Sequence, residues 1–144
     1  MAEQIHGAAL NGKVLFENKD DTLIAPSNIP NLGDGVSVQG GIRVEGNLLV
    51  ISIFIQMMVG NASNGWYSIY DDLSSITGGK TVVPTKIPGI TYADTTNIVN
   101  SGDMLVNFDY GSFNWGNKIA IYPGYSSSSE CWTTYNGTAL LIDN

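Results

Sequence analysis

The stretch GIRVEGNLLVISIFIQM, residues 41–57, carries hydrophobic residues at alternate positions. Its odd positions 49–57 read Leu, Ile, Ile, Ile and Met, whereas its even positions 50–56 read Val, Ser, Phe and Gln. Successive side chains of a β-strand point to opposite faces of the sheet, so the pattern predicts a strand over Leu48–Met58 with one face wholly buried. The second face is half apolar, although an antiparallel sheet usually exposes that face to water. It therefore requires a cover, either another copy of the chain or a loop such as Ser74–Pro88.

Short runs of β-branched and aromatic residues recur along the whole chain, separated by turn-forming pairs such as Gly46-Asn47, Gly78-Gly79 and Asn136-Gly137. This spacing is typical of all-β sandwiches and barrels, and no stretch keeps a helical period over three turns. We therefore expect an antiparallel β-sandwich, jelly-roll-like or barrel head with little helix. The predicted strands are Lys13–Glu17, Thr22–Ile24, Ser37–Val44, Leu48–Met58, Trp66–Tyr70, Thr81–Val83, Gly89–Tyr92, Met104–Asp109, Lys118–Tyr122, Cys131–Thr134 and Thr138–Ile142.

The chain divides into two regions of different composition. Residues 1–35 combine a charge cluster with Pro26 and Pro30, which favour an extended or looped path over continuous sheet. We interpret them as an N-terminal arm or attachment segment, or alternatively as edge strands of the same domain. Residues 36–144 form the predicted head, in which Gly40-Gly41 indicates a β-bulge or a close approach of two backbones.

The net charge and the length of the longest apolar run argue against two classes of partner, nucleic acid and membrane. The 13 acidic and six basic residues give a net charge of −7, which argues against nucleic acid as the main partner because phosphate binding requires clustered Lys and Arg. The longest uncharged apolar run, Leu48–Val59, is shorter than the roughly 20 residues of a membrane helix, so we expect no membrane partner. The opening residues lack a signal-peptide pattern, which predicts synthesis in a cytoplasm. The single cysteine, Cys131, is interpreted as a small apolar residue at the start of a strand.

Motifs of catalysis and of metal or cofactor binding do not occur in the sequence. It contains no Gly-x-Ser-x-Gly, no His-Glu-x-x-His and no phosphate loop, so we expect no enzyme activity, no catalytic residues, no metal and no cofactor. Adjacent acids such as Asp71-Asp72 are typical of solvated turns, and no calcium-loop spacing surrounds them. A glycan hydrolase using Asp109 and Glu130 is one alternative, because two carboxylates can cleave a sugar linkage.

Aromatic residues set among amides and hydroxyls are the strongest chemical signal. The segment NFDYGSFNWGNK, residues 107–118, offers flat rings beside amide and carboxylate groups, a combination that suits sugars. Trp115 lies outside any apolar alternation and is predicted to be exposed for stacking, whereas Trp66 and Trp132 are interpreted as core residues. The candidate saccharide-binding residues are Asn107, Asp109, Tyr110, Asn114 and Trp115.

The succession of VSVQGGIRVEGNLLVISIFIQ, NGWYSIYDDLSSI followed by prolines, and TTYNGTALLID resembles the C-terminal heads of phage receptor-binding proteins. Such heads occur on tail fibres and baseplates of phages that infect Gram-positive bacteria, and the resemblance covers residues 36–144. It implies a homotrimer of β-heads that binds host cell-wall saccharide near subunit boundaries. Family sites resemble His-x-Asp followed shortly by Trp; Asp109 and Trp115 match this pattern, and Asn107 stands where the histidine is expected.

The resemblance also offers a cover for the second face of Leu48–Met58. If Val50, Phe54 and Met58 face the threefold axis of a trimer, both faces of the strand are buried, and each buried side chain contributes about 1.5–3 kcal/mol. The implied protein is a virion tail or baseplate component, synthesised in the host cytoplasm, that contacts other tail proteins through its N-terminal segment. A structural virion protein with no ligand of its own and a cellular lectin domain are the remaining alternatives.

Overall fold

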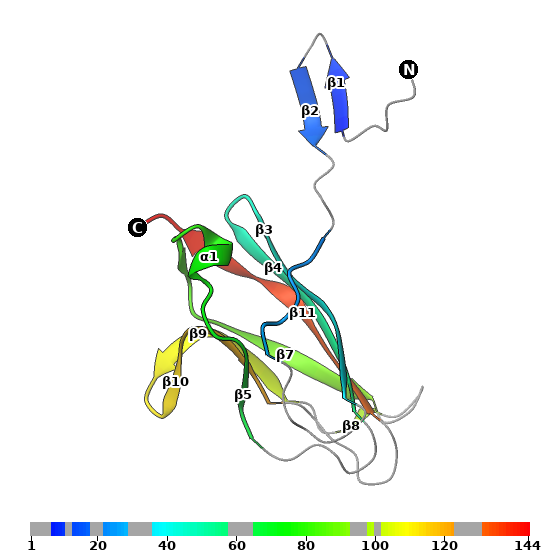
Figure 1. The fold of residues 1–144 in the computed structure, drawn as a ribbon, viewed down its shortest axis with the longest axis vertical. Helices are drawn as coiled ribbons and strands as arrows, with labels where there is room; N and C mark the ends of the chain where they lie inside the picture. Colours follow the sequence, from blue (N-terminus) through cyan, green and yellow to red (C-terminus); the bar gives the residue numbers. More distant parts are fainter. Residues whose placement is uncertain are drawn as a thin grey trace.

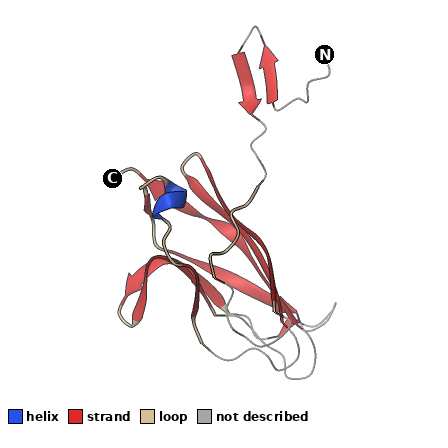
Figure 2. Cartoon of the chain, viewed as in Figure 1, coloured by secondary structure: helices blue, strands red, loops and turns tan. Residues whose placement is uncertain are grey.

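The computed structural model describes residues 7–10, 13–17, 22–28, 36–57, 65–92, 98–99, 102–122 and 131–144. Within these ranges the chain is almost entirely β-structure (Figure 2), with one short helix. The elements in chain order are β1 Gly7–Leu10, β2 Lys13–Glu17, β3 Ser37–Glu45, β4 Leu48–Met57, β5 Tyr67–Tyr70, α1 Ser74–Thr77, β6 Thr81–Val82, β7 Thr85–Tyr92, β8 Ile98–Val99, β9 Asp103–Tyr110, β10 Phe113–Ile121 and β11 Cys131–Ile142.

The head is one curled antiparallel sheet in the strand order β3-β4-β11-β7-β9-β10-β5, with β6 and β8 added beside β11 and β7 (Figure 1). Strand β7 connects its two halves. Residues Thr85–Pro88 pair with β9, whereas Gly89–Tyr92 pair with β11. Strands β1 and β2 pair only with each other in the described residues. The predicted all-β class with little helix is therefore confirmed.

The core lies inside the curl of this sheet. The odd positions 49–55 of β4 are 2% exposed or less, as the alternation predicted, and they pack with β9 and β10 side chains such as Val106 and Ile119. The even positions point to the opposite side, which we call the outer face. There Val50 and Phe54 are half-buried and Ser52 is exposed.

Two glycines allow neighbouring backbones to come unusually close at β3. Gly40 has a φ of +84°, and a Cβ atom there would lie 2.1 Å from the carbonyl oxygen of Ser52. A Cβ atom at Gly41 would lie 2.2 Å from the carbonyl oxygen of Ile24. The register between β3 and β4 runs without a shift, so close approach is the correct alternative and a bulge is not.

Residues Thr22–Asn28, which we call the strap, join the two edges of the sheet. At the β3 edge, Ile24 and Ile42 exchange backbone hydrogen bonds of 2.8 and 3.1 Å. At the β5 edge, the amide of Asn28 donates to the carbonyl of Ile69 at 3.1 Å. The strap therefore packs on the head.

A buried tyrosine holds the strap. The hydroxyl of Tyr70, a residue that is 2% exposed, donates to the carbonyl oxygen of Ile24 at 2.5 Å. Burial raises the pKa of Tyr70 far above its ordinary value, so the hydroxyl keeps its proton and remains a donor. Edge strands β3 and β5 are thus linked through one short segment, which protects both edges.

Several local predictions need correction. The turn predicted at Asn136-Gly137 is wrong, because both residues lie inside β11, which pairs continuously with β4 from Cys131 to Leu140. Strand β7 begins at Thr85, four residues before the prediction. Trp66 and Trp132 are partly buried but do not belong to the buried core cluster, so their interpretation as core residues is wrong. The interpretation of Cys131 is confirmed, because it begins β11 and is buried. In the described residues, no helix has the length and hydrophobicity required to cross a membrane.

Candidate saccharide-binding site

Residues 107–116 of the β9–β10 hairpin extend beyond their neighbouring strands, and we call this part the hairpin arm (Figure 1). Strand β7 pairs with β9 no further than Val106, and β5 pairs with β10 no further than Ile119. The turn at its tip, Gly111-Ser112, contains only two residues, and Gly111 has a φ of +61°. The segment predicted to be an irregular aromatic loop is therefore mostly strand.

The register places the candidate residues on two faces of the arm. Asn114 lies opposite Asp109, and Trp115 lies opposite Phe108. Because opposite residues of an antiparallel pair share a face and adjacent residues alternate, Asp109 and Asn114 lie on one face and Trp115 on the other. Asp109 packs over Gly116, where a Cβ atom would come within 3.3 Å of it.

The second face of the arm is aromatic. Phe108, Tyr110, Phe113 and Trp115 alternate onto it, and Tyr110 is 78% exposed. The rings of Phe108 and Phe113 meet edge to face with centroids 6.1 Å apart. Phe108, Phe113 and Trp115 are partly buried, so the prediction that Trp115 is exposed is wrong. Tyr110 is the ring of this face that is most open to a ligand.

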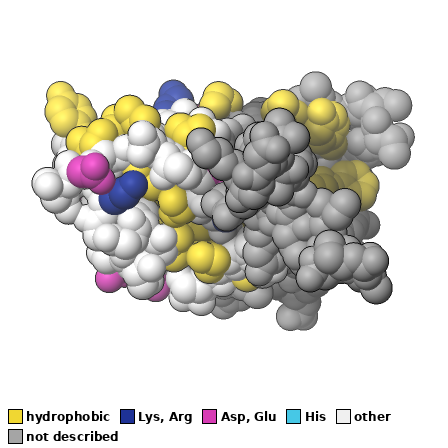
Figure 3. Space-filling model, turned by 90° about the horizontal axis from the view of Figure 1, so that it is seen from above, with side chains coloured by type: hydrophobic (Ala, Val, Ile, Leu, Met, Phe, Trp, Pro, Cys, Tyr) yellow, Lys and Arg dark blue, Asp and Glu magenta, His cyan; other side chains and the backbone are white. Residues whose placement is uncertain are grey.

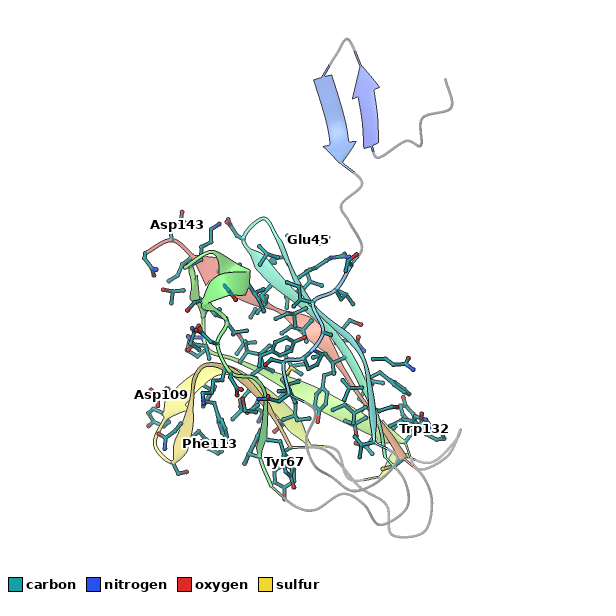
Figure 4. The ribbon with its side chains drawn as sticks, viewed as in Figure 1. Glu45, Tyr67, Asp109, Phe113, Trp132 and Asp143 are labelled. Carbon is teal, nitrogen blue, oxygen red and sulfur yellow. The ribbon has the colours of Figure 1, made fainter. Side chains whose placement is uncertain are left out.

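Trp66 supports one side of this surface. Its ring meets Phe113 edge to face at 5.7 Å and Tyr122 at 5.4 Å. Figure 4 shows Phe113 on the side of the hairpin that faces Tyr67, the residue after Trp66. Edge-to-face contacts stabilise ring positions, so the Phe113 side of the aromatic face is held in place without a ligand.

Two asparagines with left-handed backbones anchor the base of the arm. Asn107 has a φ of +48° and Asn117 a φ of +54°, a conformation that asparagine tolerates better than most residues. The side chain of Asn107 donates to the carbonyl of Val82 at 2.5 Å and accepts from the amide of Asn117 at 2.6 Å. Asn107 thus fixes the arm to β6 and β10, and we do not include it in the ligand contact proposed below.

The adjacent acids Asp71 and Asp72 also bind the chain itself. Asp72 accepts from the amide of Ser74 at 2.9 Å and from Asn117 at 2.7 Å. Hydrogen bonds from Ser74, backbone first, lower the pKa of Asp72, and those from Ser68 and Asn28 lower the pKa of Asp71. Asp72 thus links α1 to the base of the hairpin arm, and Asp71 links β5 to the strap.

The structure places Asp109 opposite Asn114 on one face and puts Trp115 and Tyr110 on the other face. Phe108 and Phe113 were missed as site residues, although the sequence shows aromatic residues two apart at 108 and 110 and again at 113 and 115. Glu130 of the alternative hydrolase and Met58 of the predicted trimer contact lie outside the described residues. In the described part of the chain, no three His, Cys, Asp or Glu side chains gather to hold a metal ion.

No protein-family model matches the chain, and no curated protein or solved structure matches it either.

Proposed function

We propose that the chain is a non-enzymatic adhesion head that binds a cell-surface saccharide, as in the tail of a phage that infects Gram-positive bacteria. The observation that supports this proposal most is the aromatic face of the hairpin arm, with Tyr110 78% exposed at its tip. Exposed rings held on a strand framework suit the apolar face of a sugar. The β-rich head supports the same proposal.

In this proposal, Trp115 and Tyr110 stack on sugar rings, and the hairpin arm brings them to the ligand. Asp109 and Asn114 lie on the opposite face, from which they can hydrogen-bond a saccharide chain that continues around the edge of the arm. The two faces therefore make unequal contributions, with stacking supplying most of the affinity.

The proposal includes a homotrimer, in which three shallow sites together compensate for weak single-site binding. Linked sites raise the effective concentration of the ligand after the first contact and so increase the overall affinity. The N-terminal residues would connect the head to other tail proteins.

Cell-wall polysaccharide binding by the intact protein tests the site. We expect Trp115→Ala and Tyr110→Ala each to weaken binding at least about tenfold, equivalent to about 1.4 kcal/mol per site. Asn114→Ala should weaken binding less, because it removes a hydrogen bond and leaves the aromatic face intact. Isothermal titration calorimetry with solubilised polysaccharide measures these differences.

Ser112→Ala is the matched control, because Ser112 is exposed in the same hairpin and carries no ring. Unchanged binding by both aromatic variants would overturn the hairpin site. Release of reducing ends from the polysaccharide by the wild-type protein would instead support a glycan hydrolase and contradict the non-enzymatic part of the proposal.

A further inference from the structure

The outer face of β3, β4 and β11 contains a second arrangement of polar and aromatic side chains, remote in sequence from the hairpin arm. On this face Phe54 lies between Gln39 of β3 and Thr134 of β11, its direct cross-strand partners. Ser52 lies in the next row of the same face, directly opposite Asn136. The half-apolar stripe of β4 is thus one strand wide and has polar neighbours on both sides.

These residues surround a hollow of about 340 Å³ on the outer face. The hollow lies beside Gly40, which has no side chain, and beside Ser52, whose side chain is small. Its volume is at the lower end of the roughly 300–1,000 Å³ of small-molecule sites. The hollow is lined by Gln39, Gly40, Ser52, Phe54, Thr134 and Asn136, among other atoms.

The lining groups match one chemical class of ligand. Two side-chain amides and two hydroxyls can donate and accept hydrogen bonds, and the Phe54 ring adds an apolar surface. None of the lining residues is charged. Over the described surface seen in Figure 3 as a whole, charged side chains are few. A neutral, hydroxyl-rich ligand fits this set, whereas an ionic ligand would lose its hydration without a counter-charge.

One hydrogen bond prearranges the hollow. The hydroxyl of Ser52 donates to Oδ1 of Asn136 at 3.0 Å, which fixes these two lining side chains relative to each other. Both side chains project from central strands of the sheet, whose backbones are held by ladders on two sides. Sites built on strands are held more rigidly than sites built on loops.

We propose that this hollow binds one neutral sugar unit, as a second saccharide site distinct from the hairpin arm. Gln39 and Asn136 bind the sugar hydroxyls, and Phe54 packs against the apolar face of the ring. The inference rests on the proposed function for its ligand class but uses none of the hairpin residues. It also assigns Phe54 to a ligand and so removes it from the predicted trimer contact.

Backbone amide chemical shifts of the intact ¹⁵N-labelled protein test this site, with glucose, galactose, rhamnose and N-acetylglucosamine as probes. We expect at least one sugar to shift the amides of Gln39, Ser52 and Asn136 in a saturable way. Gln39→Ala and Asn136→Ala should each weaken that binding at least about fivefold. Thr138→Ala is the matched control. Thr138 is exposed on the same strand and the same face, two residues after Asn136.

The outcomes separate the two sites. Shifts confined to the hairpin arm, abolished by Trp115→Ala, would overturn the hollow and leave the proposed function standing. Shifts at the hollow that survive Trp115→Ala would support the inference even if the hairpin site fails. No shift at Gln39, Ser52 or Asn136 with any of the four sugars would overturn the inference.

Discussion

At the scale of single residues, side-chain size and backbone conformation decide where strands can approach. Gly40 is the clearest case, because its φ of +84° and its distance to the Ser52 carbonyl both exclude a side chain. The sequence indicated this role through the Gly40-Gly41 pair but could not choose between a bulge and a close approach. That choice depends on Ser52 and Ile24, which are distant in the sequence.

We expect Gly40→Ala to lower the free energy of unfolding by more than about 2 kcal/mol, because a left-handed non-glycine residue costs about 1–2 kcal/mol before any clash. Gly46→Ala is the matched control: Gly46 has a φ of +57°, but a Cβ atom there would meet nothing within 4 Å. It should cost about 1 kcal/mol. Urea denaturation compares the two, and equal losses would show that the contact with Ser52 does not constrain the chain.

At the scale of elements, two segments take their positions from contacts that the sequence pattern does not display. The strap reaches β3 and β5 through Ile24 and Asn28, so its position depends on both edges of the sheet. The hairpin arm takes its direction from Asn107 and Asn117 at its base, where the register shifts between Trp115 and Ile119. The alternation of hydrophobic and polar residues predicted that the strands exist. The positions of the strap and of the hairpin arm depend on hydrogen bonds between residues far apart in the sequence.

Tyr70→Phe tests the attachment of the strap. The variant keeps the ring in the core and removes only the hydrogen bond to Ile24, so we expect a loss of about 1 kcal/mol and faster amide exchange at Ile24 and Ile42. Tyr135→Phe is the control, because its hydroxyl makes a longer bond of 3.3 Å to the Tyr122 carbonyl and does not touch the strap. Unchanged exchange at Ile24 in Tyr70→Phe would mean that the strap is held by its backbone bonds alone.

At the scale of the whole molecule, the outer face combines exposed aliphatic side chains with polar ones. It leaves large aliphatic side chains exposed at one end, with Leu48 at 40% and Leu140 and Ile142 at 48%. Association of copies would remove such surface from water. The same face carries polar residues around Phe54, which a protein contact would have to desolvate.

The assembly prediction is a homotrimer of three times the 15.4 kDa chain mass, measured by light scattering at micromolar concentration. Phe54→Ser should leave this mass unchanged and weaken sugar binding, because we place Phe54 in the hollow. A lower mass for Phe54→Ser would return this residue to the trimer contact and contradict its ligand role. A wild-type mass of one chain would overturn the trimer itself.

The sequence alone determined the β class, most of the strands and the buried face of β4. The reason is that the alternation of hydrophobic and polar residues is a local pattern that predicts a strand directly. It also located the aromatic residues of the hairpin arm, which share a short segment. Only the tertiary structure decided that Asp109 and Trp115 lie on opposite faces, that Asn107 anchors the arm, and that Phe54 has polar neighbours. These facts depend on strand register and on pairing between distant segments, and neither leaves a periodic signal in one chain.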